Sequence, residues 1–393
     1  MKFLIGVCGI GLGHAGRSLR LAERLTQAGH EVFFTSFGEA QEFLQKRKSC
    51  KVYNIPPYEW YSTGLEPNWS MSALYGAPII HRIIKGYKKI LELIKKEKPD
   101  VVLSDTDFPS LLAIAKENQR VKGYYLTNTL RIGRLGRQLL ENGHITSRML
   151  TENLKCIFNQ KIDTLFRYLY KKCKKVYCLD FPPPYTLAQH NMLEENPFAT
   201  KLQYIGVIGG KQSHELPSKE KLMEKLELNK EHPTLYIGVS GPNKDSLLYF
   251  FEELFDERLD KNIIITTGTP STDHVYKNKK VKVFNWYPVR EELIKVADVV
   301  IARAGLGTIS EILAFGKKSI LIPELQPEQI ENANALEQRS LCLVMDEKTL
   351  DKKNFEAQLE IILQDSKMEK QLNEYQMLCS KYNALSAITD DFN

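Results

Sequence analysis

The stretch 298-DVVIARAGLGTISEILAFGKKSILIPE-324 decides the fold of this chain. It begins with an apolar, β-branched run typical of a buried strand, turns at Gly305–Thr308, continues as a helix towards Phe315 and ends in a second apolar run. A strand, a helix and a second strand in this order form a parallel βαβ unit. The stretch therefore predicts an α/β domain with a parallel sheet.

The same alternation of strands and helices runs through both halves of the chain. Candidate strands in the first half are "KFLIGVC", "EVFFTSF", "KVYNI", "DVVLSD" and "GYYLTN", and in the second half "TLYIGVS", "NIIITTG", "KVFNW" and "CLVMD". We expect two Rossmann-like parallel-sheet domains, 1–208 and 233–366, joined by a polar linker, 209–232. A C-terminal helical segment, 367–393, follows, and the sequence does not decide what it packs against. Ligands of such sheets bind beyond the carboxyl ends of the strands, so the strand-end loops of the two domains should face a common cleft.

Composition limits the class of protein. The 393 residues are 43% hydrophobic and 26% charged, as expected for a soluble two-domain chain. Seven cysteines without a CxxC pair favour a reducing compartment and no zinc site. No uncharged stretch approaches the roughly 20 residues that a membrane span needs. We therefore expect a cytoplasmic protein, either free or peripheral on the membrane.

A glycine-rich loop, 8-CGIGLGHAGRS-18, follows the first candidate strand. Its Gly11, Gly13 and Gly16 have the spacing of a dinucleotide-binding turn, but that function needs an acidic residue at the end of the second strand, where the chain has "FFTSFGE". A nicotinamide site is therefore disfavoured. The glycines still allow an anion or a sugar to approach the backbone at a helix N-terminus. The alternative is a tight strand-to-helix turn without a ligand.

His14, in the middle of this loop, is the candidate general base. A helix N-terminus favours neutral imidazole, the form that can accept a proton from an acceptor hydroxyl. Asp105, at the end of "DVVLSD", would emerge from a neighbouring strand and orient His14, and Asp107 is the competing candidate. The alternatives are that neither aspartate has this role and that His14 only packs on the loop.

Two segments resemble one family. "GIGLGHAGRS", together with 302-ARAGLGTISEILAFGKKSILIPELQPEQIENANAL-336, resembles glycosyltransferases of the GT-B fold, in particular the group containing MurG, which adds N-acetylglucosamine to a lipid-linked precursor. The second segment is the specific one, because its Arg-x-Gly-x-x-Thr-x-x-Glu pattern followed by Glu-Gln-x-x-Asn-Ala fixes many positions. The resemblance implies an inverting transferase that uses a UDP-sugar as donor substrate and needs no other cofactor.

The second segment also has a physical interpretation. The backbone N–H groups from Gly305 onward and the Thr308 hydroxyl can cradle a diphosphate at a helix N-terminus. Arg303 could add positive charge there. Glu311, three residues beyond Thr308, lies on the same helix face, and the resemblance implies that it accepts hydrogen bonds from the ribose hydroxyls. The alternative for Glu311 is a solvated helix residue.

The remaining donor contacts come from the resemblance. Glu328 and Gln329 match the pair that binds the donor sugar, and Trp286 and Tyr287 match the base pocket. A solvated helix position is the alternative for Glu328, and core packing is the alternative for Trp286. Ser240 and Gly241, in "VSGPNK", give a weaker signal for a donor-phosphate contact.

No metal site is expected. The Asp105-x-Asp107 pair stands in the N-terminal half, away from the predicted donor phosphates, so the helix end and Arg303 would stabilise the leaving diphosphate. The alternatives that remain open are a nucleotide-sugar hydrolase or a soluble small-molecule glycosyltransferase of the same fold, and a non-catalytic nucleotide-sugar-binding subunit.

Charge is uneven along the chain. Residues 1–208 carry 30 Lys and Arg against 18 Asp and Glu, a net +12, whereas the remainder carries a net −6. The basic half combines a Lys-rich amphipathic segment, about Ile79 to Glu97, with Arg131, Arg134, Arg137 and the aromatic and apolar residues Tyr58, Trp60, Tyr61, Trp69, Leu74 and Tyr75. This combination is typical of a surface that docks on an anionic membrane and meets a lipid or lipid-linked acceptor. The alternative is a solvated helix face over an ordinary core, and no nucleic-acid motif accompanies the charge.

Overall fold

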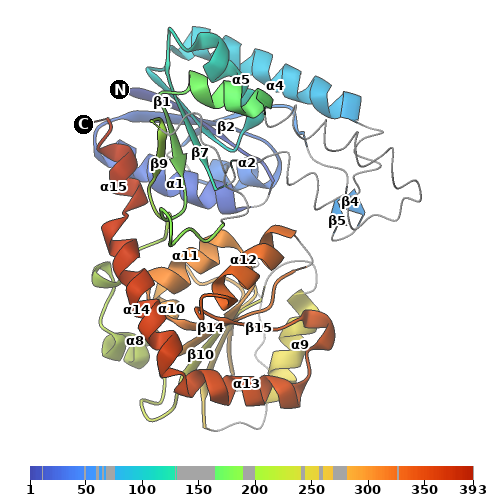
Figure 1. The fold of residues 1–393 in the computed structure, drawn as a ribbon, viewed down its shortest axis with the longest axis vertical. Coiled ribbons are helices and arrows are strands. Elements are labelled where there is room, and N and C mark those ends of the chain that lie inside the picture. Colours follow the sequence, from blue (N-terminus) through green and yellow to red (C-terminus); the bar gives the residue numbers. More distant parts are fainter. Residues whose placement is uncertain are drawn as a thin grey trace. The chain divides into compact units, whose positions relative to one another are not determined.

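The computed structural model describes residues 1–10, 12–47, 50–58, 76–128, 130, 164–188, 200–239, 244–255, 260–268, 281–324 and 327–392. Within 76–128 the side chains are described from residue 79 on. For 62–63 and 66–67 the backbone alone is described. The chain divides into two compact units. Unit 1 is residues 1–208 with 382–393, and unit 2 is residues 209–381. Each unit is built on a parallel sheet, as predicted (Figure 1).

Unit 1 contains a seven-stranded parallel sheet with the order β3-β2-β1-β6-β7-β8-β9 among the described strands. The strands are β1 Lys2–Val7, β2 Glu31–Ser36, β3 Lys51–Asn54, β6 Val101–Asp105, β7 Lys122–Thr127, β8 Lys175–Cys178 and β9 Leu202–Tyr204. A separate antiparallel pair joins β4 Ser62–Thr63 and β5 Glu66–Pro67. Because β1 and β6 are neighbours in the middle of the main sheet, the loops after them leave the same edge.

Helices cover both faces of this sheet (Figure 1). On one face α1 Leu12–Gln27, α2 Gly38–Gln45 and α15 Ala384–Thr389 bury Leu19, Leu44 and Ile388 against the strands. On the other face α4 Gly76–Glu97, α5 Phe108–Glu117 and the helical residues 164–172 bury Ile90 and Tyr170. The apolar spacing of each helix thus fixes which of its faces meets the sheet.

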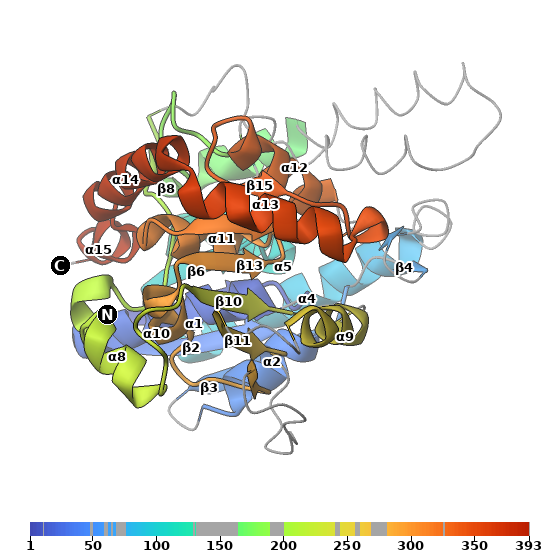
Figure 2. The same ribbon diagram turned by 90° about the horizontal axis from the view of Figure 1, so that it is seen from below.

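Unit 2 contains a six-stranded parallel sheet with the order β12-β11-β10-β13-β14-β15 among the described strands. The strands are β10 Thr234–Gly238, β11 Asn262–Thr266, β12 Val281–Phe284, β13 Val299–Ala302, β14 Lys318–Leu321 and β15 Leu343–Val344. The helices are η2 Ser213–Glu215, α8 Lys219–Lys225, α9 Lys244–Phe255, α10 Arg290–Val296, α11 Leu306–Ala314, α12 Pro327–Glu337, η3 Glu347–Thr349, α13 Lys352–Gln364 and α14 Ser366–Lys381. Figures 1 and 2 show α13 and α14 following one another along the outside of this sheet.

Two segments at domain boundaries pack within the units. The segment 209–232, which we expected to be a linker, belongs to unit 2: the Lys295 ammonium donates to the carbonyl of Ser213 at 2.8 Å, and Lys225 pairs with Glu292. The C-terminal segment 367–393 is shared, because α14 packs on α11 in unit 2 and α15 packs on α1 in unit 1. Phe392 packs edge-on against the rings of Phe3 and Tyr124 in unit 1.

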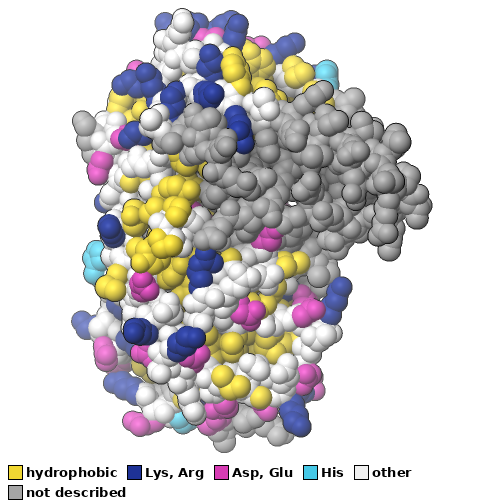
Figure 3. Space-filling model, in the orientation of Figure 1, with side chains coloured by type: hydrophobic (Ala, Val, Ile, Leu, Met, Phe, Trp, Pro, Cys, Tyr) yellow, Lys and Arg dark blue, Asp and Glu magenta, His cyan; other side chains and the backbone are white. Residues whose placement is uncertain are grey.

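The surface of α4 is basic among its described side chains. Arg82, Lys85, Lys88, Lys89, Lys95 and Lys96 are exposed, together with the apolar Ile80 and Ile84. Figure 3 shows dark blue Lys and Arg side chains beside yellow apolar ones over α4 and α5. No helix in the described part of the chain is long and apolar enough to cross a membrane.

Candidate functional site

The structure brings His14 and Asp105 together in unit 1. His14 lies in the first turn of α1, and its Nδ1 is 3.0 Å from Oδ1 of Asp105. Asp105 is the last residue of β6 and pairs in register with Val7, the last residue of β1. Parallel neighbours end on the same edge of a sheet, so the loop after β1 carries His14 past this carboxylate. His14 keeps 23% of its side chain exposed, whereas Asp105 is fully buried.

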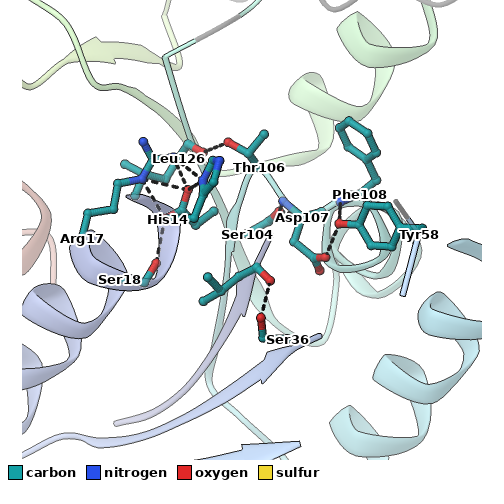
Figure 4. Close-up of polar contacts among 12 residues, drawn as sticks. His14, Arg17, Ser18, Ser36, Tyr58, Ser104, Thr106, Asp107, Phe108 and Leu126 are labelled. Atoms are coloured by element: carbon teal, nitrogen blue, oxygen red, sulfur yellow. Dashed lines mark hydrogen bonds and ion pairs between the residues drawn. The ribbon is translucent and has the colours of Figure 1, made fainter. Parts of the chain in front are cut away.

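Two further side chains of α1 hold Asp105. The Arg17 Nε donates to Oδ2 at 2.8 Å, the Arg17 Nη2 donates to Oδ1, and the Ser18 hydroxyl donates to Oδ2 at 2.7 Å. Figure 4 shows His14, Arg17 and Ser18 converging from the helix on this point. Burial opposes ionisation of Asp105, but the Arg17 guanidinium and the His14 ring hold the pKa of this carboxyl well below its usual range. Asp105 is therefore an ionised, fully bonded carboxylate.

Asp107 has a structural role. It is the N-cap of α5, accepting from the Ser110 backbone N–H at 3.0 Å and from the Tyr58 hydroxyl at 2.6 Å (Figure 4). Burial raises the pKa of Asp107 above its usual value. Of the two candidates left open by the sequence, the structure places Asp105 beside His14. Tyr58 is only 1% exposed, so our expectation that it belongs to a membrane-facing aromatic group is wrong.

The glycines of the first loop fall into two kinds. A Cβ added to Gly9 would lie 2.4 Å from Phe37, so packing requires glycine there. A Cβ at Gly13 or Gly16 would meet none of the described atoms within 4 Å, so packing against this part of the chain does not require glycine there. This open space is what a loop needs if a ligand is to approach its backbone. Gly11 lies outside the described residues.

In unit 2 the predicted diphosphate cradle is the N-terminus of α11. Its N-cap residue is Gly305, which has no side chain to cap the helix. The first N–H groups of a helix have no partner within it, so they are suited to bind an anion. A Cβ at Gly305 or Gly307 would meet no atom of the described residues within 4 Å, and Thr308 lies half-buried in the first turn. Ser240 and Gly241 lie outside the described residues.

Glu311 follows one turn further along α11, but it is not the solvated residue that its helix position allowed. It is only 2% exposed, and the Arg290 guanidinium, at the start of α10, donates to its Oε2. The Arg290 cation thus holds this carboxylate in place. A ribose that binds at Glu311 must approach beside Arg290, which is 40% exposed and lies against it.

The predicted base-binding residues follow β12. Trp286 is 47% exposed, which excludes the alternative that it packs in the core. Tyr287 is half-buried, packs edge-on against Phe284 and donates its hydroxyl to Glu292 at 2.7 Å. The exposed indole is available to flank a planar ring, whereas the tyrosine supports the loop.

Arg303 lies where its charge is already compensated. The guanidinium is 5% exposed, donates to Glu347 at 2.7 Å and to the carbonyl of Ile322 at 3.0 Å, and its Nε is 3.8 Å from Glu324. That Arg303 also adds charge to a bound diphosphate, as expected from the sequence, stays a prediction. The contact with Glu347 joins residues 44 positions apart, which local sequence patterns do not show.

The two residues of the predicted sugar-binding pair, Glu328 and Gln329, have different surroundings. Gln329 exchanges two hydrogen bonds with Glu324, accepting from its backbone N–H at 3.1 Å and donating to its Oε2 at 3.3 Å. Burial raises the pKa of Glu324. Glu328 is exposed at the start of α12. Glu324, Arg17 and Arg290 were not predicted from the sequence. Only Arg17 had a local signal, because it stands three residues after His14 on one helix face.

Comparisons with known proteins find glycosyltransferases. Residues 1–139 match the family model "Glycosyl transferase family 1", and residues 247–388 match "Glycosyltransferase family 28 C-terminal domain". An uncharacterized glycosyltransferase of Methanosarcina mazei is 28% identical over 395 residues, covering 99% of this chain and 97% of the relative. The UDP-N-acetylglucosamine–N-acetylmuramyl-(pentapeptide) pyrophosphoryl-undecaprenol N-acetylglucosamine transferase of Clostridium tetani is 26% identical over 355 residues, covering 87% and 85%.

The fold has close structural counterparts. The crystal structure of CalG4, the calicheamicin glycosyltransferase, superposes with a TM-score of 0.71 at 14% identity and covers 100% of this chain and 97% of that one. Together with the two parallel sheets, this likeness confirms the predicted GT-B fold. Among the described residues, no group of three or more His, Cys, Asp or Glu side chains could hold a metal ion.

The Arg290–Glu311 pair yields a stability prediction. Replacing Arg290 by Met leaves a carboxylate that is 2% exposed without this cation, so we expect the free energy of unfolding to fall by about 2 kcal/mol. Lys282→Met, which removes the cation from the 87% exposed Glu227, is the control and should cost under about 1 kcal/mol. Urea unfolding followed by circular dichroism measures both. Equal losses in the two variants would contradict a special role for the Arg290–Glu311 pair.

Proposed function

We propose that this glycosyltransferase of the GT-B fold transfers a sugar, with inversion, from a UDP-sugar to a hydroxyl of a lipid or lipid-linked acceptor at a membrane surface. The observation that carries the proposal is the pairing of His14 with the buried, ionised Asp105 at the carboxyl end of the unit 1 sheet. A neutral imidazole that donates Nδ1–H to a carboxylate presents Nε2 as a proton acceptor. This is the base that a hydroxyl acceptor requires.

The donor would bind in unit 2. The uncapped N-terminus of α11 supports binding of the diphosphate, since its N–H groups and dipole attract negative charge. The fixed carboxylate of Glu311 would accept hydrogen bonds from the ribose, and the exposed Trp286 indole would flank the base. Gln329, held by Glu324, and the exposed Glu328 would contact the sugar hydroxyls.

The chemistry is a single displacement. His14 Nε2 takes the proton of the acceptor hydroxyl while that oxygen forms a bond to the anomeric carbon of the donor sugar. The bond between this carbon and the diphosphate oxygen breaks, and UDP leaves with the electron pair. The helix α11 dipole and N–H groups stabilise the charge that develops on the leaving group. Attack opposite the leaving group inverts the anomeric centre.

The name of the Clostridium tetani relative and the surface of α4 both support a lipid-linked acceptor. That name specifies a pyrophosphoryl-undecaprenol acceptor. Exposed Lys and Arg side chains on α4, with Ile80 and Ile84 among them, form the surface expected of a helix that lies on an anionic bilayer. Trp60, Tyr61, Trp69, Leu74 and Tyr75, and Arg131, Arg134 and Arg137, lie outside the described residues.

The catalytic part is tested by His14→Ala. We expect turnover to fall by roughly 100-fold or more with little change in UDP affinity, because general-base catalysis contributes about 10²–10⁴. Transfer is measured by incubating the enzyme with a panel of labelled UDP-sugars and membrane lipid extract and counting label in the organic phase. His214→Ala, at an exposed histidine of unit 2, is the control. Unimpaired turnover in His14→Ala would disprove the base assignment, and free sugar released without acceptor would point to a hydrolase.

The membrane part is tested by reversing charge on α4. The wild type should sediment with vesicles containing anionic lipid and be released by salt, since each Lys or Arg near such a surface contributes about 1 kcal/mol. Changing Lys85, Lys88 and Lys89 to Glu should reduce sedimentation and leave UDP affinity unchanged. The control reverses three exposed lysines of unit 2, Lys348, Lys353 and Lys367. A wild-type protein that does not sediment with anionic vesicles and glycosylates a soluble small molecule would contradict the proposal of a lipid acceptor.

A further inference from the structure

Arg17 occupies an unusual place for a residue beside a His–Asp pair. It lies one helical turn after His14 on α1, with 12% of its side chain exposed. Its Nε contacts both oxygens of Asp105, at 3.1 and 2.8 Å, and its Nη2 contacts Oδ1. The same Nη2 is 2.8 Å from Nδ1 of His14. The guanidinium therefore contacts both members of the pair.

The three groups compete at a single nitrogen. His14 Nδ1 lies 3.0 Å from Asp105 Oδ1 and 2.8 Å from Arg17 Nη2. In neutral imidazole this nitrogen either donates to the carboxylate or accepts from the guanidinium, but it cannot do both. When His14 is protonated, Nδ1 can only donate, and the Arg17 cation then faces a second positive charge at van der Waals distance.

Charge decides what this arrangement does. A His–Asp pair alone places one negative charge beside the imidazole and stabilises imidazolium. Here the Arg17 cation and the Asp105 anion sum to zero within a site where Asp105 is fully buried and screening by water is weak. We propose that Arg17 is a positioning residue that cancels the charge of Asp105, so that His14 stays neutral and able to accept a proton at lower pH than a His–Asp pair alone allows.

Two other ionisable groups are described at these strand ends, Cys8 and Asp107. Cys8, after β1, is buried, and burial raises the pKa of its thiol to about 12, so it stays neutral. Asp107, after β6, is held by Ser110 and Tyr58 away from the imidazole, and burial raises its pKa. Ser18 donates to Asp105 without adding charge. In the part of the chain that the structure describes, Arg17 and Asp105 are thus the charged groups that contact the His14 ring.

The inference rests on the proposed role of His14 as base, but its test needs neither donor nor acceptor. The full-length protein is labelled with ¹⁵N-histidine and titrated by NMR, and the His14 signals are identified by their absence in His14→Ala. Arg17→Met should raise the titration midpoint of His14 by about one pH unit, since removing a cation within about 4–6 Å favours imidazolium. Arg17→Lys, which keeps the charge, should stay near the wild-type midpoint.

Two further variants keep the test decisive. Arg24→Met removes the same charge from an exposed position of α1 and should leave the midpoint unchanged. The double variant Arg17→Met with Asp105→Asn removes both charges, so the His14 midpoint should return towards the wild-type value. It also leaves no unpaired buried carboxylate, so it can be measured if Arg17→Met alone folds poorly. An unchanged or lowered midpoint in folded Arg17→Met, or a double variant that differs from wild type by a full pH unit, would overturn the inference.

The activity profile separates this inference from the proposed function. In Arg17→Met the acidic limb of the pH profile of kcat/KM should move upward by the same amount as the NMR midpoint, with Arg17→Lys restoring it. Normal turnover in His14→Ala would defeat the base role while leaving the NMR result standing. If the His14 midpoint is the same in the wild type and in Arg17→Met, while His14→Ala inactivates the enzyme, only the charge-cancelling role of Arg17 is disproved.

Discussion

A carboxylate buried at the end of a central strand constrains the whole of unit 1. Asp105 is fully buried, and an unpaired charge in that position would cost several kcal/mol. Arg17 and Ser18, in the second turn of α1, donate hydrogen bonds to it, and Nδ1 of His14, in the first turn, contacts it. The ion pair therefore fixes the start of α1 over the edge of β1 and β6. The same contacts that satisfy the buried charge also aim the imidazole, so stability and the proposed catalysis depend on one interaction.

Unit 2 uses the same principle at its own strand ends. Glu311 is fixed by Arg290, and Arg303 is fixed by Glu324 and Glu347. Each pair holds a charged side chain next to the uncapped N-terminus of α11 or the loop before α12. In the proposed cradle the N-terminus of α11 would supply the positive end, which suits a diphosphate that must bind and later leave. The proposed donor site thus relies on backbone dipoles.

The sequence predicts the fold and the placement of His14 well, for physical reasons. Alternating apolar runs and amphipathic helices determine parallel sheets, and parallel sheets bring Asp105 and the loop after β1 to one edge. The choice between Asp105 and Asp107 needed the structure, because it turns on which carboxylate ends β6 and which caps α5. The roles of Arg290, Arg303 and Tyr58 also escaped prediction, since each is set by a partner far along the chain.

The central claim is that unit 2 binds a UDP-sugar through α11 and Glu311. The most direct test is calorimetric titration of UDP into the wild type, Glu311→Ala and Glu311→Gln, with unfolding measured in parallel to separate binding from stability. The account predicts that the wild type binds UDP and that Glu311→Ala weakens binding by about 1–3 kcal/mol, because ribose hydroxyls lose a fixed acceptor in a desolvated site. Wild-type affinity in a folded Glu311→Ala, or no UDP binding by the wild type, would contradict it.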